Sequence, residues 1–160
     1  MFGNAMSTLG ILVVMTILII GSIYMGVAGK FLHEKYIDVI DDDNIMWLKT
    51  TYILIFLGTA LLGLGAVLTL IVPIFILMQR GFIVKVLSIA EGLAYLAGCL
   101  AYSCAAYFAF KARSDKAEFD DLWRQLNTLG VFSIIFAVLA LMVGGYAISY
   151  KRMEAEDESD

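Results

Sequence analysis

One carboxyl side chain stands out among the residues that could do chemistry, because it lies inside an apolar segment. Glu91 follows Lys85 by six residues, about 9 Å along a helix, and no other charged residue follows until Lys111. An ionisable group at such a place costs a few kcal/mol unless it is paired, protonated or hydrated, and it marks a functional site by default. We expect its partner to be Lys85, Arg80 or a hydroxyl of its own or a neighbouring helix. Both a structural helix-helix contact and the handling of ions, protons or lipid headgroups remain open.

The other reactive residue types form no recognisable catalytic or metal-binding arrangement. His33 is the only histidine, and the run DDDN at 41–44 lacks the alternating ligands and central glycine of an EF-hand. Cys99 and Cys104 would lie about 140° apart on one helix, which rules out a disulfide bond within it. We therefore expect no catalytic residue, cofactor or metal, and we interpret the acidic run as a solvated turn.

The apolar segments that must position Glu91 are long enough to cross a membrane. The chain has 160 residues, 61% of them hydrophobic, against roughly 45–50% in soluble domains. Long stretches of the chain contain no charged residue, and each stretch approaches the roughly 20 residues that a hydrocarbon core of about 30 Å requires. These stretches predict four membrane spans, at about 8–29, 51–78, 86–110 and 127–150.

The same segments are apolar on every face, whereas the strands of a β-barrel alternate apolar and polar residues. We therefore predict an all-α integral membrane four-helix bundle with short loops. A single domain would occupy residues 1–153, and residues 154–160 would form a disordered acidic tail. The formal net charge of −4 and the absence of a basic patch exclude nucleic acid as a partner.

The short polar segments suggest how the bundle meets the membrane surface. Trp47 and Trp123 are suited to anchor at the interface between membrane and water. We expect the segment before residue 50 to fold back onto the membrane surface, and residues 115–126 to form an amphipathic surface helix. Pro73, the only proline, predicts a kink near the exit of the second span. Lys and Arg residues number seven on one side and four on the other, interspersed with acidic residues, so charge alone does not settle orientation.

Small residues recur at steps of three or four in the third span and part of the second. Such faces allow close helix contact in lipid, where no hydrophobic effect drives helices together. The face would serve packing within the bundle or a contact between copies of the chain. It comprises Ala90, Ala94, Gly98, Ala101 and Ala105 in the third span and Thr59, Gly63 and Ala66 in the second.

The third and fourth spans resemble those of the MARVEL group of tetraspan proteins, which includes the synaptophysin, occludin and myelin-and-lymphocyte families. The resemblance rests on Glu91 near the start of the third span, the series LAYLAGCLAYSCAAYFAF, the polar exit KARSDK, and the fourth span GVFSIIFAVLALMVGGYAISYKR. It implies cytosolic termini, a left-handed four-helix bundle in the plasma membrane or a vesicle membrane, and a role in membrane apposition, trafficking or junctions. The paired loop cysteines of several junctional members are missing, which argues against adhesion through disulfide-bonded loops.

These features predict a non-enzymatic protein that organises membranes or membrane-protein assemblies. Its partners would be membrane lipids, other integral membrane proteins or further copies of itself. An alternative is a small channel former, or an accessory subunit of a channel or transporter, with Glu91 in a polar path. A third class is a subunit that scaffolds a redox or lipid-modifying complex.

Overall fold

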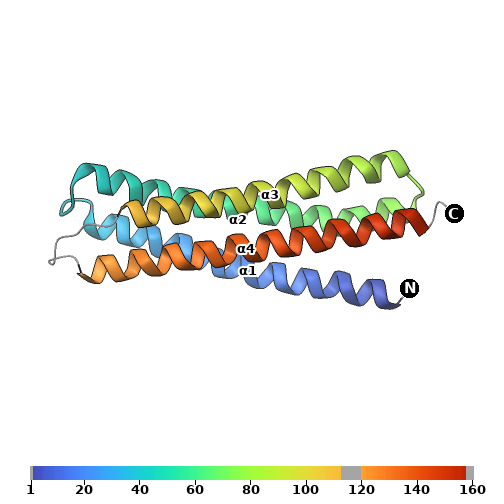
Figure 1. Cartoon of the computed structure of the whole chain (residues 1–160), viewed down its shortest axis with the longest axis horizontal. Coiled ribbons are helices and arrows are strands. Elements are labelled where there is room, and N and C mark those ends of the chain that lie inside the picture. The colour runs from blue at the N-terminus through green and yellow to red at the C-terminus, as the bar shows by residue number, and fades with distance from the viewer. Residues whose placement is uncertain (1, 113–119, 158–160) are drawn as a thin grey trace.

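Four long helices make up the part of the chain that the computed structural model describes, residues 2–112 and 120–157. They are α1 (Phe2–Tyr36), α2 (Asp42–Leu77), α3 (Gly81–Lys111) and α4 (Asp120–Asp157). The helices run antiparallel in chain order, and the amino and carboxyl ends lie at the same end of the bundle (Figure 1). The predicted all-α four-helix architecture is confirmed.

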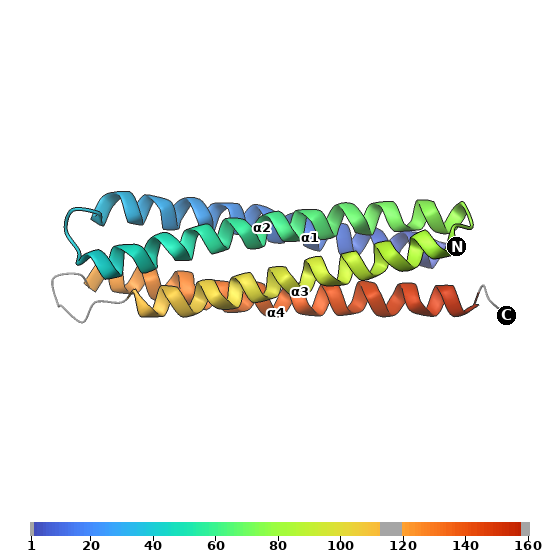
Figure 2. The same ribbon diagram turned by 90° about the horizontal axis from the view of Figure 1, so that it is seen from above.

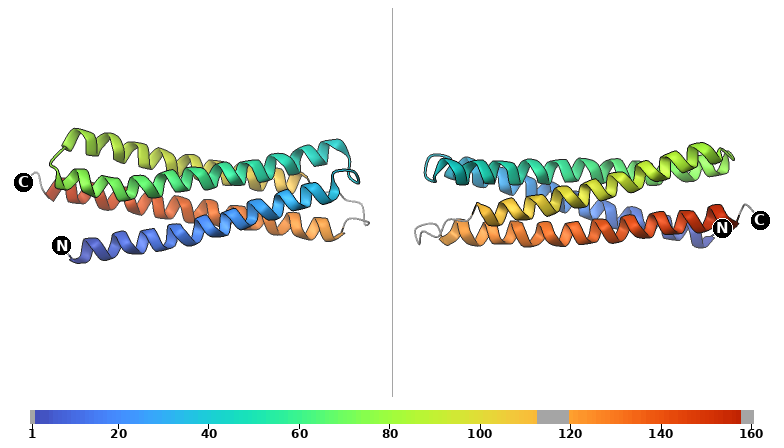
Figure 3. Two further views of the ribbon diagram at one scale, coloured as in Figure 1. Left: turned by 180° about the vertical axis from the view of Figure 1, so that it is seen from behind. Right: turned by 45° about the horizontal axis from the view of Figure 1, so that its top comes forward.

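Helix α3 lies at the centre of the packing. It packs extensively against both α2 and α4, whereas α1 contacts mainly α2 (Figure 2). Toward its amino end α1 diverges from α4, as Figure 3 shows from behind. A residue on the buried face of α3 is therefore placed between α2 and α4.

The outer surface of the bundle is strongly apolar along all four helices. Phe82, Leu77 and Tyr24 are 81%, 78% and 78% exposed, and many other large apolar side chains face outward. All four helices are long and apolar enough to cross a membrane. Acyl chains cover such a surface, and a helix satisfies its own backbone in lipid. The fold is that of a multi-pass membrane protein.

The helices are longer than the predicted spans. They contain 31 to 38 residues, or about 46–57 Å, against a hydrocarbon core of about 30 Å. The prediction of a surface loop that extends to residue 50 is wrong, because only residues 37–41 separate α1 from α2. Asp42 and Asp43 lie in the first turn of α2, where the helix dipole stabilises acidic side chains. The acidic run that we interpreted as a turn thus begins a helix.

The end of the chain also differs from expectation. Helix α4 continues to Asp157, so the prediction of disorder is wrong for residues 154–157. Residues 158–160 lie outside the described residues. The residues after Tyr150 are mostly strong helix formers such as Lys, Arg, Met, Glu and Ala, which explains the continuation. The predicted surface helix is partly outside the described residues, at 115–119. Its remaining part forms the start of α4, with Leu122 and Leu126 buried in the core.

Candidate functional site: two buried polar clusters

Glu91 lies on the buried face of α3 and is 0% exposed. The Thr69 hydroxyl of α2 lies 2.5 Å from Glu91 Oε1, and 2.6 Å from the hydroxyl of Tyr95, one turn further along α3. The single proton of the Thr69 hydroxyl has two acceptors, Glu91 Oε1 and, at 2.9 Å, the carbonyl oxygen of Gly65, so the Tyr95 hydroxyl donates to Thr69. We call these three residues the Glu91 cluster. It joins α2 to α3.

The partner of Glu91 on α2 is thus a hydroxyl, one of the kinds of partner that we expected. Lys85 and Arg80 are exposed, and the structure pairs neither of them with Glu91. Pro73 lies one turn beyond Thr69 in α2, which continues past it to Leu77. Since proline has no backbone N–H, the Thr69 carbonyl lacks its usual donor from residue 73. The proline therefore interrupts the backbone bonding of α2 beside this cluster, and a kink there stays a prediction.

The depth of Glu91 in the membrane follows from the lysines that bound its span. Lys85 and Lys111 are about 39 Å apart along α3, so the midpoint of the span lies at Gly98. Glu91 is then about 10 Å from the midplane, inside a hydrocarbon half-thickness of about 15 Å. The carboxyl group lies near one edge of the hydrocarbon region, on the side of the chain termini (Figure 1).

A second set of hydroxyls joins three helices on the other side of the midplane. Ser22 of α1 bonds both Thr59 of α2 and Tyr102 of α3, and all three side chains are buried. The Thr59 proton is committed to the carbonyl of Ile55, at 2.8 Å. Ser22 therefore donates to Thr59, and Tyr102 donates to Ser22. This chain of bonds, the Tyr102 cluster, satisfies each hydroxyl proton and ends on a backbone acceptor.

Glycines provide the space for the two tyrosines. A Cβ atom at Gly65 of α2 would lie 2.6 Å from the Tyr95 ring, and one at Gly144 of α4 would lie 2.7 Å from the Tyr95 Cβ. Gly58 similarly faces the Tyr102 ring, at 3.0 Å. The large side chains of α3 thus fit against glycines of the adjacent helices. The packing of tyrosine against glycine holds both clusters between closely packed helices.

The predicted small-residue face of α3 is buried within the bundle. Ala94, Ala101 and Ala105 are at most 5% exposed, Gly98 packs against α2, and Ala90 is half-buried. On α2, Thr59 is buried and Ala66 packs partly against the core.

The prediction is wrong for Gly63, because a Cβ there would meet no atom within 4 Å and the residue is therefore not at a close helix contact. The glycines that receive the tyrosines, at 58, 65 and 144, were missed. Their only sequence signal was spacing: Gly58 and Gly65 are seven residues apart, as are Tyr95 and Tyr102.

The two tryptophans lie at the end of the bundle opposite the termini, near the start of α2 and of α4 (Figure 1). Trp47 stacks on Phe108 with ring centroids 5.2 Å apart, and the Lys111 ammonium lies 3.9 Å from the Trp47 centroid. Trp123 is half-buried in the first turns of α4. Both positions suit the interfacial role that we predicted, and no residue of this end is shared with the polar clusters.

Among the described residues, no group of three or more His, Cys, Asp or Glu side chains could hold a metal ion. Comparison of the chain with protein-family models, with curated proteins and with solved structures finds no match.

Proposed function

We propose that this chain is a non-enzymatic tetraspan membrane protein that organises membranes or membrane-protein assemblies. The observation that carries the proposal is how the interior is occupied. The small-residue face of α3 packs within the bundle, and the hydroxyls of both clusters bond to groups of the same chain. The surface left for interaction is the apolar exterior of the helices, which is suited to lipids and to the spans of other proteins.

The resemblance of the third and fourth spans to MARVEL proteins supports a role in trafficking, at junctions or as a scaffold. On the same basis we propose a plasma-membrane or vesicle location with both termini cytosolic. The finding that both termini lie at one end of the bundle is compatible with this orientation (Figure 1).

The mass of the particle purified from native membranes tests this function. We expect a particle larger than one chain with a fixed stoichiometry, measured after mild solubilisation and by cross-linking within the intact membrane. The chain produced alone in a host membrane is the control: the same mass there indicates self-assembly, and a smaller mass indicates a partner protein. A single chain with no cross-linked neighbour in native membranes would contradict the proposal.

A second candidate is a channel former, or an accessory subunit of a channel or transporter. The complete burial of Glu91 with two hydroxyls favours it, because such a group is rare inside a membrane and is often functional. The distance between the clusters weighs against a continuous polar path. Thr59 and Thr69 are about 15 Å apart along α2, and fully buried Leu62 lies between them. We therefore rank this candidate second.

A further inference from the structure

A tyrosine hydroxyl faces outward from α1 close to the middle of the membrane. Ser22 of α1 bonds Thr59 of α2. Thr59 follows Gly58, whose carbonyl oxygen would lie 3.6 Å from a Cβ atom at Gly98, the midpoint of the span of α3. Tyr24 comes two residues after Ser22, so it lies within about 5 Å of the midplane. Its side chain is 78% exposed.

The Tyr24 hydroxyl cannot reach the lipid headgroups from this depth. The edge of the hydrocarbon is about 15 Å from the midplane, farther than an extended tyrosine side chain spans from this position. Side chains also lean toward the amino end of their helix, which here is the direction of the midplane. The usual place of an outward-facing tyrosine, at the interface between membrane and water, is therefore out of reach.

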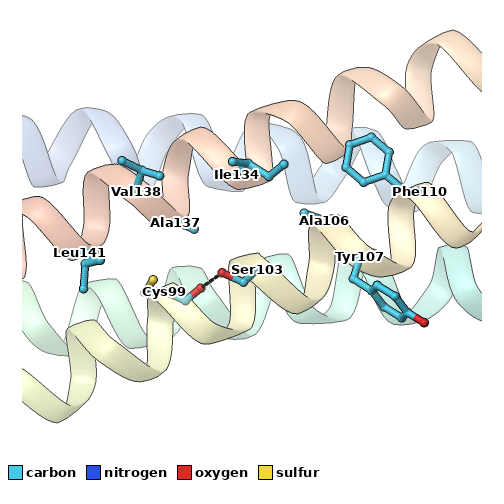
Figure 4. Close-up of a pocket in the computed structure, with 9 residues that line it drawn as sticks. All are labelled: Cys99, Ser103, Ala106, Tyr107, Phe110, Ile134, Ala137, Val138 and Leu141. Atoms are coloured by element: carbon cyan, nitrogen blue, oxygen red, sulfur yellow. Dashed lines mark hydrogen bonds between the residues drawn. The ribbon is translucent and has the colours of Figure 1, made fainter.

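The hydroxyl also lacks a partner among the residues that the structure describes. Two other outward-facing hydroxyls bond to their own helices: Thr16 donates to the carbonyl of Leu12, and Ser103 to that of Cys99, at 2.8 and 2.9 Å (Figure 4). The ring of a tyrosine holds its hydroxyl too far from its own backbone for such a bond. Acyl chains offer no acceptor, and an unbonded hydroxyl in hydrocarbon costs free energy. Tyr24 thus points to a polar group outside this chain.

Tyr24 lies within an apolar stripe on the outer side of α1, which we call the Tyr24 face. Its members recur at alternating steps of four and three residues, the spacing at which two helices pack side by side along their length. None is charged, and each is at least 52% exposed: Val13, Ile17, Ile20, Tyr24, Val27 and Phe31. A polar residue at one position of such a contact fixes its register and the number of chains.

We propose that the Tyr24 face binds the same face of a second copy of this chain, with the two Tyr24 hydroxyls bonded to each other. Copies with the same orientation hold Tyr24 at the same depth, and a two-fold axis normal to the membrane brings identical residues together. A hydroxyl both donates and accepts, so Tyr24 complements itself. The dimer is one contact of a membrane assembly, and in this sense it rests on the proposed function.

Energy transfer between donor-labelled and acceptor-labelled copies of the purified full chain, in phosphatidylcholine liposomes, tests the contact. We expect the unmodified chain to dimerise. Tyr24→Phe removes only the hydroxyl and should weaken the dimer about threefold, the factor for an average polar contact between helices in lipid. The matched control is Tyr107→Phe, which removes the hydroxyl of a tyrosine of α3 that is 61% exposed and should leave the dimer unchanged.

Oxidative cross-linking tests which face is used, in a chain that carries Cys99→Ala and Cys104→Ala. Ile20→Cys should form a disulfide bond with the second copy, because Ile20 lies in the Tyr24 face. Leu100→Cys is the control, at a similar depth on α3 and with similar exposure, and should form none.

A purified chain that does not associate would overturn the proposal, as would equal effects of the two phenylalanine substitutions or equal cross-linking of the two cysteine variants. A cross-link from Ile20→Cys to a different protein in native membranes would also overturn it, since a partner protein would then cover the face. The proposed function fails only if the particle in native membranes is a single chain. Failure of the dimer is therefore distinguishable from failure of that function.

Discussion

Buried hydroxyl groups form the hydrogen bonds between helices in both polar clusters of this protein. Glu91 could be singled out from the sequence because it was the only ionisable residue well inside a span, and Tyr95 follows it by one turn on the same face. Its partner Thr69 could not be identified, because several spans contain hydroxyl residues and only the packing of α2 on α3 selects one. The Tyr102 cluster was missed altogether, since it combines single hydroxyls from three helices.

A matched pair of substitutions measures what these hydroxyls contribute. Tyr102→Phe removes the donor to Ser22 and should lower the free energy of unfolding by about 0.6 kcal/mol, the average for polar contacts between helices in lipid, and by no more than about 1.7 kcal/mol. Ser133→Ala is the control, because Ser133 is 0% exposed and its Oγ has no hydrogen-bond partner within the described structure. Removing that oxygen should leave stability equal or higher.

Denaturant titration in mixed micelles, followed by circular dichroism, gives both values. An equal loss in the two variants would show that the bond to Ser22 contributes nothing and would contradict the role given to the Tyr102 cluster.

At the scale of helices, hydropathy alone predicted the four elements, because an uncharged segment of 20 or more residues has few alternatives. Their ends could not be predicted, since polar residues beyond the apolar core, as at the end of α4, also favour helix. The helix contacts were only partly predictable. A stripe of small residues shows that a close contact exists, but which glycine receives a tyrosine depends on the relative rotation of two helices.

Substitutions at two glycines of α2 distinguish a glycine that receives a tyrosine from one that does not. Gly65→Ala places a Cβ 2.6 Å from the Tyr95 ring and should destabilise the bundle by about 1–3 kcal/mol through overpacking. Gly63→Ala, where a Cβ meets nothing within 4 Å, should be neutral or slightly stabilising because alanine is the better helix former. Thermal unfolding in one detergent compares them, and a larger loss for Gly63→Ala would refute the assigned helix rotation.

The turn between α2 and α3 contains a residue in an unfavourable backbone conformation. Gln79 has a φ of 54°, and the N–H groups of Gln79 and Arg80 bond the carbonyls of Ile76 and Phe75. This is the Schellman pattern, in which glycine is preferred at the left-handed position. Gln79→Gly should therefore raise the free energy of unfolding by about 1 kcal/mol.

Met78→Gly is the control for this turn, because the φ of Met78 is −82° and the substitution there offers no relief. Chemical denaturation of both variants checks the expectation. A Gln79→Gly variant less stable than the unmodified chain would show that Gln79 does not adopt this conformation in the membrane.

For the whole molecule, the two polar clusters lie on opposite sides of the midplane and join different sets of helices. The Tyr102 cluster holds α1, α2 and α3 together, whereas the Glu91 cluster holds α2 and α3 close to α4. The apolar layer between them, which includes Leu62 and Gly98, lies near the middle of the membrane. We infer that these clusters join helices and do not line a path across the bilayer.

Proton and cation flux into liposomes containing the purified chain tests that claim most directly, with Glu91→Gln as the matched variant and empty liposomes as the baseline. Glutamine preserves the shape of the side chain and can still accept a hydrogen bond from Thr69, so the bundle should assemble in both cases. We expect flux at the baseline for both proteins. Flux well above that of empty liposomes, lost in a folded Glu91→Gln variant, would contradict it and establish the channel alternative.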